Sequence, residues 1–281
     1  MNERDPRIDT VLEVQDLCLS FPALRGGRLL VLDNVSFEVG RRETVGLVGQ
    51  SGSGKTMTAL SIMGLNPPGS SLDGGHILLE GKDLLGNGSR PRYRGKRIGM
   101  IFQSPTASLN PLIRVGKQIA RVLELHRNAS LDEARGLSIE LMKSVGINDA
   151  DRRWHAYPHQ LSGGMAQRVM IAMALGPEPE ILVADEPTTA LDVTIQDQIF
   201  ELLLEVQERM HMSILLITHD LAVVAETCDR VVVMKEGRVV ERGTVEGIFE
   251  RPGDPYTKEL LGSVLRPDRR IERRKQPVES A

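Results

Sequence analysis

Residues 49–56 carry the clearest chemical pattern in the sequence. The segment reads Gly49, Gln50, Ser51, Gly52, Ser53, Gly54, Lys55 and Thr56. The glycines allow a tight, concave turn whose backbone N–H groups point inward at phosphate oxygens. The lysine side chain can reach the terminal phosphates of a nucleotide, and the threonine hydroxyl can bind Mg²⁺. The pattern therefore predicts a nucleotide-phosphate site, in preference to an ordinary glycine-rich turn.

The segments on either side of this loop have the structures that such a site needs. Residues 43–48 are apolar and β-branched, which predicts a strand, whereas residues 57–63 have the spacing of a helix. A loop between a strand and a helix places the helix N-terminus, with its partial positive charge, beneath the phosphates. We therefore expect nucleotide to bind here.

Two adjacent carboxylates form the second candidate for chemistry. Asp185 and Glu186 end the apolar run 181–184, a pattern typical of a buried parallel strand whose C-terminal end carries functional residues. An aspartate beside a phosphate loop can hold Mg²⁺, and a glutamate directed the other way can accept a proton from attacking water. We interpret Asp185 as a metal ligand and Glu186 as the general base, rather than as a surface pair.

Two more polar residues follow predicted strands. His219 comes directly after the apolar run 213–218, and Gln103 follows residues 98–102. Because the C-terminal ends of parallel strands meet at one edge of the sheet, we expect His219 to lie near the carboxylates and to be functional. Gln103 either caps a loop or, near the phosphates, coordinates the metal or positions water.

The first part of the chain contains a candidate base-stacking residue. Residues 11–21 and 30–39 alternate apolar and polar side chains, which predicts two antiparallel strands with a turn at Gly26 and Gly27. Phe21, at the end of the first strand, could stack on an adenine or pack into the core. Its position in the sequence does not decide between the two.

Between residues 114 and 176 the sequence is helical in pattern. Ser130 and Glu133 form a capping box that starts one helix. Ser162, Gly163 and Gly164 start another. Helix-start N–H groups with glycines that allow close approach make a second phosphate-type site, although a plain serine N-cap has the same sequence.

The C-terminal third contains further regular elements. Residues 194–210 form an amphipathic helix, and residues 230–242 form a hairpin that turns at Glu236 and Gly237. From residue 251 we predict a peripheral extension, with an amphipathic turn at residues 260–261. The basic run 266–275 is expected to be solvated and partly disordered.

The bulk composition excludes several classes of protein. A net charge of −3 gives no overall basic field for nucleic acid. Cys18 and Cys228 are too few for a disulfide framework and are not in metal-ligand spacing, which fits a reducing cytosol. The charged N-terminus is unlike a signal peptide, and no apolar run approaches the roughly 18 residues of a spanning helix. Any membrane role must therefore be through a partner.

With these motifs in order, the sequence resembles the nucleotide-binding subunit of an ABC transporter over nearly the whole chain. Residues 161–165 match the family signature, between Walker A at 49–56 and Walker B at 181–186. The resemblance adds ATP contacts at Ser162, Gly163 and Gly164. It also assigns Phe21 to the A-loop, Thr58 to the nucleotide contacts after Walker A, Gln103 to the Q-loop, Asp192 to the D-loop and His219 to the switch histidine.

The resemblance implies the α/β fold of a P-loop NTPase of the ABC ATPase type. A mainly parallel core sheet would carry an N-terminal antiparallel β-subdomain and a helical signature subdomain at about residues 100–176. Residues 1–250 would form the ATPase domain, and residues 251–281 would form a C-terminal extension.

Within the family, three segments resemble the oligopeptide, dipeptide and nickel importer group: residues 157–160, 185–194 and 251–261. Some members of that group carry a C-terminal cysteine cluster for an iron–sulfur centre. No cysteine follows Cys228, so we predict no cluster. Nickel or an opine-like compound is an alternative cargo, and a soluble ABC ATPase acting on nucleic acid is a further alternative.

The resemblance also implies an assembly. ATP and Mg²⁺ would lie between the Walker loop of one subunit and the signature of a second ABC ATPase subunit, either a paralogue or a second copy. Two membrane permease subunits would contact the segment 103–123, and an extracytoplasmic substrate-binding protein would deliver the cargo. The chain would be peripheral, on the cytoplasmic face of the bacterial inner membrane, and no nucleic-acid partner is expected.

Overall fold

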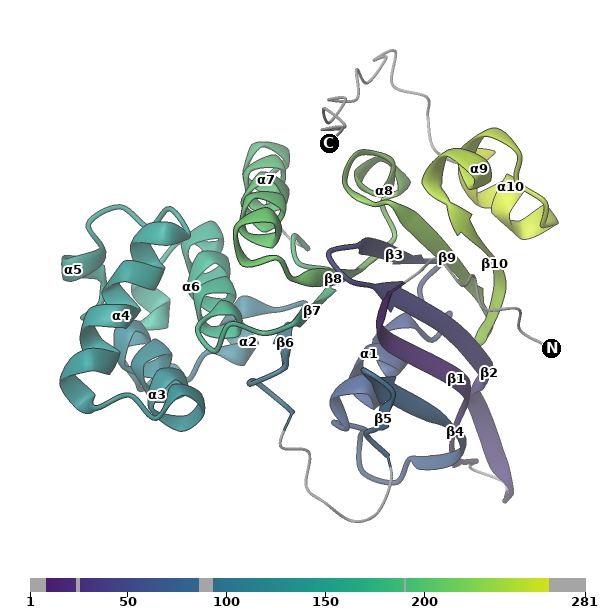
Figure 1. Cartoon of the computed structure of the whole chain (residues 1–281), viewed down its shortest axis with the longest axis horizontal. Helices are drawn as coiled ribbons and strands as arrows, with labels where there is room; N and C mark the ends of the chain where they lie inside the picture. The colour runs from purple at the N-terminus through teal and green to yellow at the C-terminus, as the bar shows by residue number, and fades with distance from the viewer. Residues whose placement is uncertain (1–8, 24–25, 86–92, 190, 263–281) are drawn as a thin grey trace.

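The molecule contains two β-sheets, of which one lies near the middle of the view in Figure 1 and the other at the lower right, with a group of helices at the left. The structure is a computed structural model, and it describes residues 9–23, 26–85, 93–189 and 191–262. The remaining residues, including the predicted basic run 266–275, lie outside this description.

The first sheet is antiparallel, with the strand order β2-β1-β4-β5. Its strands are β1 (Thr10–Pro22), β2 (Arg28–Gly40), β4 (Ser71–Leu79) and β5 (Lys82–Asp83). The two strands predicted at the start of the chain are thus confirmed as a pair. The next strand, β4, begins at Ser71 and pairs with β1 as far as Ser20.

The second sheet has the order β10-β9-β3-β8-β7-β6, and all neighbours are parallel except the edge pair β9 and β10. Its strands are β3 (Thr44–Val48), β6 (Ile98–Ile101), β7 (Ile181–Asp185), β8 (Ser213–Thr218), β9 (Arg230–Lys235) and β10 (Arg238–Thr244). Val48 pairs with Thr218, and Ile101 pairs with Ala184. The C-terminal ends of β3, β8, β7 and β6 therefore meet at one edge.

The helices pack on both faces of the parallel sheet. They are α1 (Lys55–Met63), α2 (Pro105–Ser108), α3 (Val115–Arg127), α4 (Leu131–Ser144), α5 (Ala150–Arg153), the 3-10 helix η1 (Pro158–Gln160), α6 (Gly163–Leu175), α7 (Val193–Met210), α8 (Leu221–Thr227), α9 (Val245–Glu250) and α10 (Pro255–Gly262). Successive strand residues point to opposite faces. Val183 and Leu215 pack with α1 and the antiparallel sheet, whereas Leu182 and Ile214 pack with the helical segment.

The helical segment predicted for residues 114–176 is confirmed. Helices α3 to α6 lie together at one side of the molecule (Figure 1) around a shared apolar cluster. Both hydrogen bonds of the capping box are present, from the Glu133 N–H to the Ser130 hydroxyl and from the Ser130 N–H to the Glu133 carboxylate. The indole N–H of Trp154 donates to the Ser138 hydroxyl at 2.7 Å, which joins α4 to the segment after α5.

The region after the β9–β10 hairpin differs from the sequence prediction. The hairpin turn at Glu236 and Gly237 is confirmed, but residues 255–262 form the helix α10 instead of a peripheral turn. Tyr256 is only 5% exposed, and it packs with Val48, Val231 and other residues of the β3–β9 region. The turn prediction failed because the apolar partners of this helix lie elsewhere in the chain.

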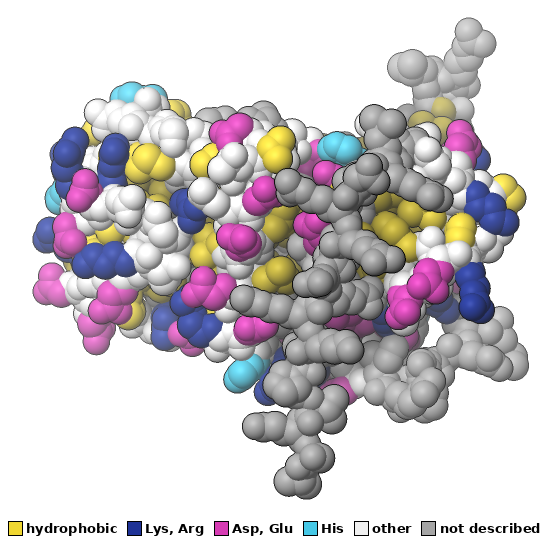
Figure 2. Space-filling view, turned by 90° about the horizontal axis from the view of Figure 1, so that it is seen from above, with side chains coloured by type: hydrophobic (Ala, Val, Ile, Leu, Met, Phe, Trp, Pro, Cys, Tyr) yellow, Lys and Arg dark blue, Asp and Glu magenta, His cyan; other side chains and the backbone are white. Residues whose placement is uncertain are grey.

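The molecular surface carries mixed charges on the face seen in Figure 2. At the end formed by the helical segment, Lys and Arg side chains are interspersed with Asp and Glu. Within the part of the chain that the structure describes, no helix combines the length and apolarity needed to cross a bilayer.

Candidate functional site

The phosphate loop, residues 49–56, connects β3 to α1 as the sequence predicts. Gly49 has φ +152°, and a Cβ at this position would lie 2.2 Å from the carbonyl oxygen of Met234 in β9. Only glycine fits this close approach. Helix α1 begins at Lys55 with Gly54 as its N-cap and no side-chain capping bond, so no capping side chain occupies its first N–H groups, which are suited to bind a phosphate.

The side chain of Lys55 folds back over the loop. Its ammonium donates to the carbonyl oxygens of Gly49 at 2.7 Å and Gln50 at 3.0 Å. Burial lowers the pKa of Lys55, and the charges of Glu186 and Asp185 oppose that effect. The lysine ammonium is therefore held against the loop by carbonyl groups of the loop itself.

Thr56 and Asp185 meet at the start of α1. The Thr56 hydroxyl donates to the Asp185 carboxylate at 3.3 Å, and Asp185 is 3% exposed. Burial raises the pKa of this carboxylate, partly opposed by the Thr56 hydrogen bond. A hydroxyl and a carboxylate are the hard oxygen ligands that Mg²⁺ prefers, and a cation would relieve the cost of burying the charge. These two residues therefore fit a magnesium site.

Glu186 is the centre of a hydrogen-bonded cluster. The amide of Gln103 donates to its Oε2 at 2.8 Å, the hydroxyl of Thr189 donates to the same oxygen at 2.9 Å, and Nδ1 of His219 lies 3.2 Å from Oε1. The backbone of Glu186 has φ +45° and its N–H donates to Ile217 O at 2.9 Å, which joins it to β8. Gln103, Glu186 and His219 thus come together from the ends of three neighbouring strands.

These contacts set the protonation of the cluster. Burial raises the pKa of Glu186, but the hydrogen bonds from Thr189 and His219, with the charges of His219 and Lys55, outweigh it and leave the pKa lowered. An ionised carboxylate can only accept hydrogen bonds, so Nδ1 of His219 carries the proton in this contact. Glu186 is therefore ionised at neutral pH, the form in which a carboxylate can accept a proton.

Gln103 contacts the Glu186 side of the site. Its amide donates to the Glu186 carboxylate, whereas within the described residues no hydrogen bond joins it to Thr56 or Asp185. The sequence interpretation also missed Thr189. The spacing in the sequence could have indicated it, because a hydroxyl three residues after a strand-end glutamate can turn back and donate to that carboxylate.

Two residues predicted to contact the nucleotide have other partners in the structure. The hydroxyl of Thr58 is fully buried and donates to Gly54 O at 3.0 Å, so it supports the loop from the core side. The carboxylate of Asp192 accepts from Ile195 N at 3.0 Å and caps α7. For Phe21 the structure shows a half-buried ring against the core cluster of the antiparallel sheet.

The signature residues form the N-terminus of α6. The Ser162 hydroxyl accepts from Met165 N at 3.3 Å, while Ser162 and Gly163 are exposed. A Cβ on Gly164 would lie 2.9 Å from Ile195 of α7, so glycine allows these helices to approach. In Figure 1, α6 belongs to the helical group and α1 lies on the other side of β7 and β8. The described part of the chain records no hydrogen bond between the signature and the phosphate loop.

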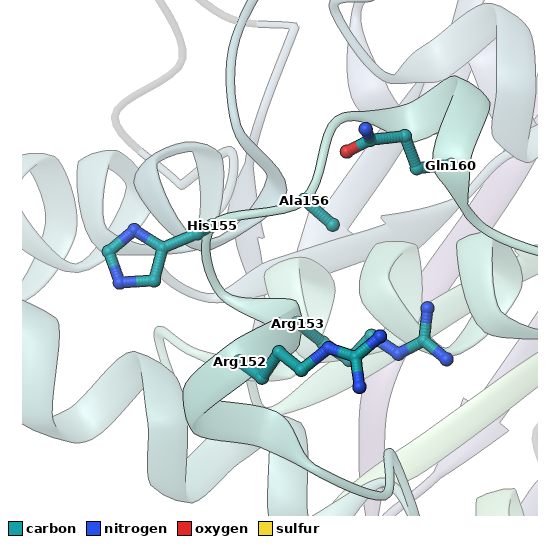
Figure 3. A pocket seen from close by; sticks show the side chains of 5 residues that line it. All are labelled: Arg152, Arg153, His155, Ala156 and Gln160. Atoms are coloured by element: carbon teal, nitrogen blue, oxygen red, sulfur yellow. The ribbon is translucent and has the colours of Figure 1, made fainter.

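A separate cavity of about 390 Å³ lies in the helical segment. It is lined by Arg152, Arg153, His155, Ala156 and Gln160. Figure 3 shows both arginine side chains extending on the same side of Ala156, with Gln160 across from them. Nδ1 of His155 lies 3.2 Å from the guanidinium of Arg114, so this basic cavity adjoins the segment that leads into α3.

A phosphate loop between a parallel strand and a helix, with a carboxylate pair at the end of another strand of the same sheet, defines a P-loop NTPase. Residues 32–189 match the family described as ABC transporter. The oligopeptide transport ATP-binding protein OppD of Bacillus subtilis (strain 168) is 50% identical over 261 residues, covering 92% of this chain and 73% of the relative. The dipeptide transport ATP-binding protein DppD of the same strain is 50% identical over 264 residues, covering 93% and 78%.

A solved structure agrees with these relatives. The ATP-binding cassette MJ0796, solved as a dimer in a post-hydrolysis state with ADP and Pi, is 27% identical with a TM-score of 0.74. The alignment covers 83% of this chain and 98% of that one. The chain belongs to the ABC transporter ATP-binding family, and it is an ATPase. The predicted family, fold class and activity are confirmed.

Proposed function

We propose that this chain is the ATP-hydrolysing subunit of a membrane importer for dipeptides or oligopeptides. The observation that carries the hydrolytic role is the cluster of Gln103, Glu186 and His219 at the sheet edge that also holds the phosphate loop. The similarity to OppD and DppD supports peptide as the cargo class. The proposed domains are residues 1–250, with the helical insertion at about 100–176, and the extension 251–281.

In the proposed reaction, Lys55 and the N–H groups at the start of α1 bind the β- and γ-phosphates of ATP. Thr56 and Asp185 would hold Mg²⁺, which neutralises phosphate charge when bound. Glu186 accepts a proton from water as the water oxygen bonds to the γ-phosphorus and the bond to ADP breaks. Gln103 and His219 orient the Glu186 carboxylate through their hydrogen bonds.

We further propose that a second ABC ATPase subunit closes the site. The exposed N-terminus of α6, with Ser162, Gly163 and Gly164, would contact the γ-phosphate across a head-to-tail dimer. Closure would then depend on the terminal phosphate, and hydrolysis would release it. The partner is a paralogue or a second copy of this chain.

The surface before α3 is the proposed contact with two permease subunits. Leu112 is 85% exposed and Ile113 is 42% exposed, next to the basic cavity through Arg114. Exposed apolar side chains beside charged groups are typical of protein interfaces. The chain would thus lie at the cytoplasmic face of the inner membrane, while a substrate-binding protein delivers peptide on the other side.

Two alternatives remain distinct from this proposal. A nickel or opine-type importer would use the same ATPase, because the ATPase does not touch the cargo. A soluble ATPase acting on nucleic acid is disfavoured by the net charge of −3 and by the interspersed charges on the face in Figure 2.

The test is uptake by the complete importer, co-purified with its permeases and binding protein and reconstituted in vesicles. We expect ATP-dependent uptake of labelled dipeptide or oligopeptide. The variant Lys55→Ala should abolish both ATP binding and uptake, because the loop loses its phosphate-binding cation. Nickel uptake without peptide uptake would instead support a nickel importer. Salt-dependent RNA or DNA binding would support a soluble ATPase that acts on nucleic acid.

A further inference from the structure

The C-terminal helix α10 contacts the beginning of the phosphate loop through one side chain. The backbone N–H of Gln50 donates to the hydroxyl of Tyr256 at 3.0 Å, across 206 residues of sequence. The tyrosine ring is buried, and it packs in the same apolar cluster as Val48, the last residue of β3. The contact therefore joins the C-terminal region directly to the loop that would bind phosphate.

Tyr256 and Lys55 hold two sides of one peptide group. The carbonyl of Gly49 accepts from the Lys55 ammonium at 2.7 Å, and the N–H of the same peptide bond, on Gln50, donates to Tyr256. Because a peptide group is planar and rigid, fixing the N–H also fixes the direction of the carbonyl. The tyrosine thus sets the orientation of the backbone oxygen that positions the lysine.

Other contacts hold Tyr256 and the start of α10 in place. The carboxylate of Glu241 in β10 accepts from the N–H groups of Gly253 at 2.6 Å and Asp254 at 3.1 Å, which attaches the start of α10 to the sheet. The ammonium of Lys235 lies 4.9 Å from the centre of the Tyr256 ring. The ring therefore cannot leave the loop without breaking several contacts.

The β9–β10 hairpin holds the other part of the same loop. The N–H of Gly237, at the hairpin turn, donates to Ser53 O at 3.0 Å. The loop is thus fixed at Gln50 by α10 and at Ser53 by the hairpin. Both contacts come from the chain after His219, a region in which the sequence pattern showed no link to the phosphate loop.

We propose that Tyr256 is a positioning residue for ATP binding, which holds the Gly49–Gln50 peptide in the orientation that the nucleotide needs. This inference rests on the proposed nucleotide site at residues 49–56. A preformed loop binds more tightly, because the backbone does not have to be ordered when the phosphates arrive. The Tyr256 hydroxyl does not contact Glu186, Gln103 or His219, so it acts on binding and not on the chemical step.

The variant Tyr256→Phe removes the hydroxyl and keeps the ring. We expect the Kd and the KM for ATP to rise about three- to tenfold, the effect of one hydrogen bond, while kcat at saturating ATP stays within about twofold. Nucleotide titration and steady-state hydrolysis on the full-length chain with its partner subunits measure both quantities.

The matched control is Tyr93→Phe, which removes the hydroxyl of another buried tyrosine, near the C-terminal end of α1. We expect this control to leave the KM for ATP unchanged. A wild-type KM in Tyr256→Phe would overturn the inference. A second result would also overturn it: an unchanged KM with a kcat that falls only as far as the folded fraction measured by thermal unfolding. That result would show that Tyr256 affects folding and not ATP binding.

Amide hydrogen exchange tests the same contact without a substitution. The Gln50 N–H of the wild-type protein should exchange slowly, because its acceptor is buried. Exchange at the rate of an open loop would overturn the inference even if Tyr256→Phe did not fold. Two results would overturn the nucleotide site itself, and this inference with it. One is a wild-type chain that does not bind ATP, and the other is a Lys55→Ala variant that binds ATP as tightly as the wild-type chain.

Discussion

At the scale of single residues, the position of Glu186 decides what the site can do. Its left-handed backbone conformation, with φ +45°, is uncommon for a residue with a side chain. That conformation follows the end of β7 and turns the carboxylate toward Gln103, Thr189 and His219. The preceding residue, Asp185, which is the last residue of β7, instead contacts Thr56. Two adjacent carboxylates thus have separate partners and separate proposed roles.

The first prediction concerns Glu186→Gln. The amide cannot accept a proton from water, so hydrolysis should fall by about 10² to 10⁴-fold. ATP binding should persist, because Lys55 and the loop backbone are unchanged. Single-turnover hydrolysis and gel filtration with ATP measure the rate and the trapped closed dimer. Turnover at the wild-type rate would remove Glu186 from the role of general base.

The second prediction separates the two interpretations of Phe21. Stacking on adenine is worth roughly 1–3 kcal/mol, so Phe21→Leu should weaken ATP binding, since leucine has no aromatic face. Apolar packing against the core is largely kept, and the cost in stability should be below about 1.5 kcal/mol. Nucleotide titration and chemical denaturation measure the two effects. Unchanged ATP affinity with reduced stability would assign Phe21 to the core alone.

At the scale of elements, helix N-termini carry several of the candidate residues. Ser162 caps α6, Asp192 caps α7 and Asp220 caps α8, each through its own side chain. A cap satisfies backbone N–H groups that the helix leaves without partners. Asp192, which the resemblance assigns to the nucleotide, therefore also caps a helix. Substitutions can separate its effect on helix stability from its effect on the nucleotide.

The third prediction tests the cap at Asp192. Replacement by alanine should lower the free energy of unfolding by about 1 kcal/mol, whereas Asp192→Asn should preserve it because asparagine caps as well as aspartate. Denaturant unfolding of the isolated chain gives both values. Equal destabilisation by the two variants would show that the charge, and not the cap, stabilises α7. Hydrolysis measured on Asp192→Asn then reports the carboxylate alone.

At the scale of the whole molecule, the chain has two regions with separate proposed roles: the edge of the parallel sheet and the helical segment. The sheet edge holds the phosphate loop and the Glu186 cluster. The helical segment presents exposed Leu112 and the basic cavity of Figure 3. Helix α6 and the segment after Gln103 join the two regions, and under the proposed function they are the route by which the nucleotide site would affect the permease surface.

The fourth prediction tests that surface. In the reconstituted importer, Leu112→Glu should reduce peptide uptake by about tenfold or more, because a charge replaces a central apolar contact. ATP hydrolysis by the chain without permeases should be unchanged, since the Leu112 side chain is 85% exposed and takes no part in the hydrogen-bonded cluster around Glu186. The matched control is Leu131→Glu on α4, which is 76% exposed and lies outside residues 103–123. Equal loss of uptake in both variants would contradict a specific surface.

The sequence by itself determined the features that depend on local spacing. The glycine loop, the apolar run before Asp185, the capping box at Ser130 and the hairpin at Glu236 each lie within a few residues, and each formed as predicted. Local backbone geometry and the periodicity of apolar side chains are sufficient for such elements. They also predicted which residue types would reach the edge of the sheet.

Only the tertiary structure decided through which atoms, and with which additional partners, those residues meet. Strand order brings Gln103 to Glu186 across 83 residues and His219 to Glu186 across 33 residues. The contact between Tyr256 and Gln50 spans 206 residues. Contacts of this length depend on packing between distant elements, which local patterns do not encode. The residue types of the candidate site could therefore be predicted from the sequence, whereas the contact between the C-terminal helix and the phosphate loop could not.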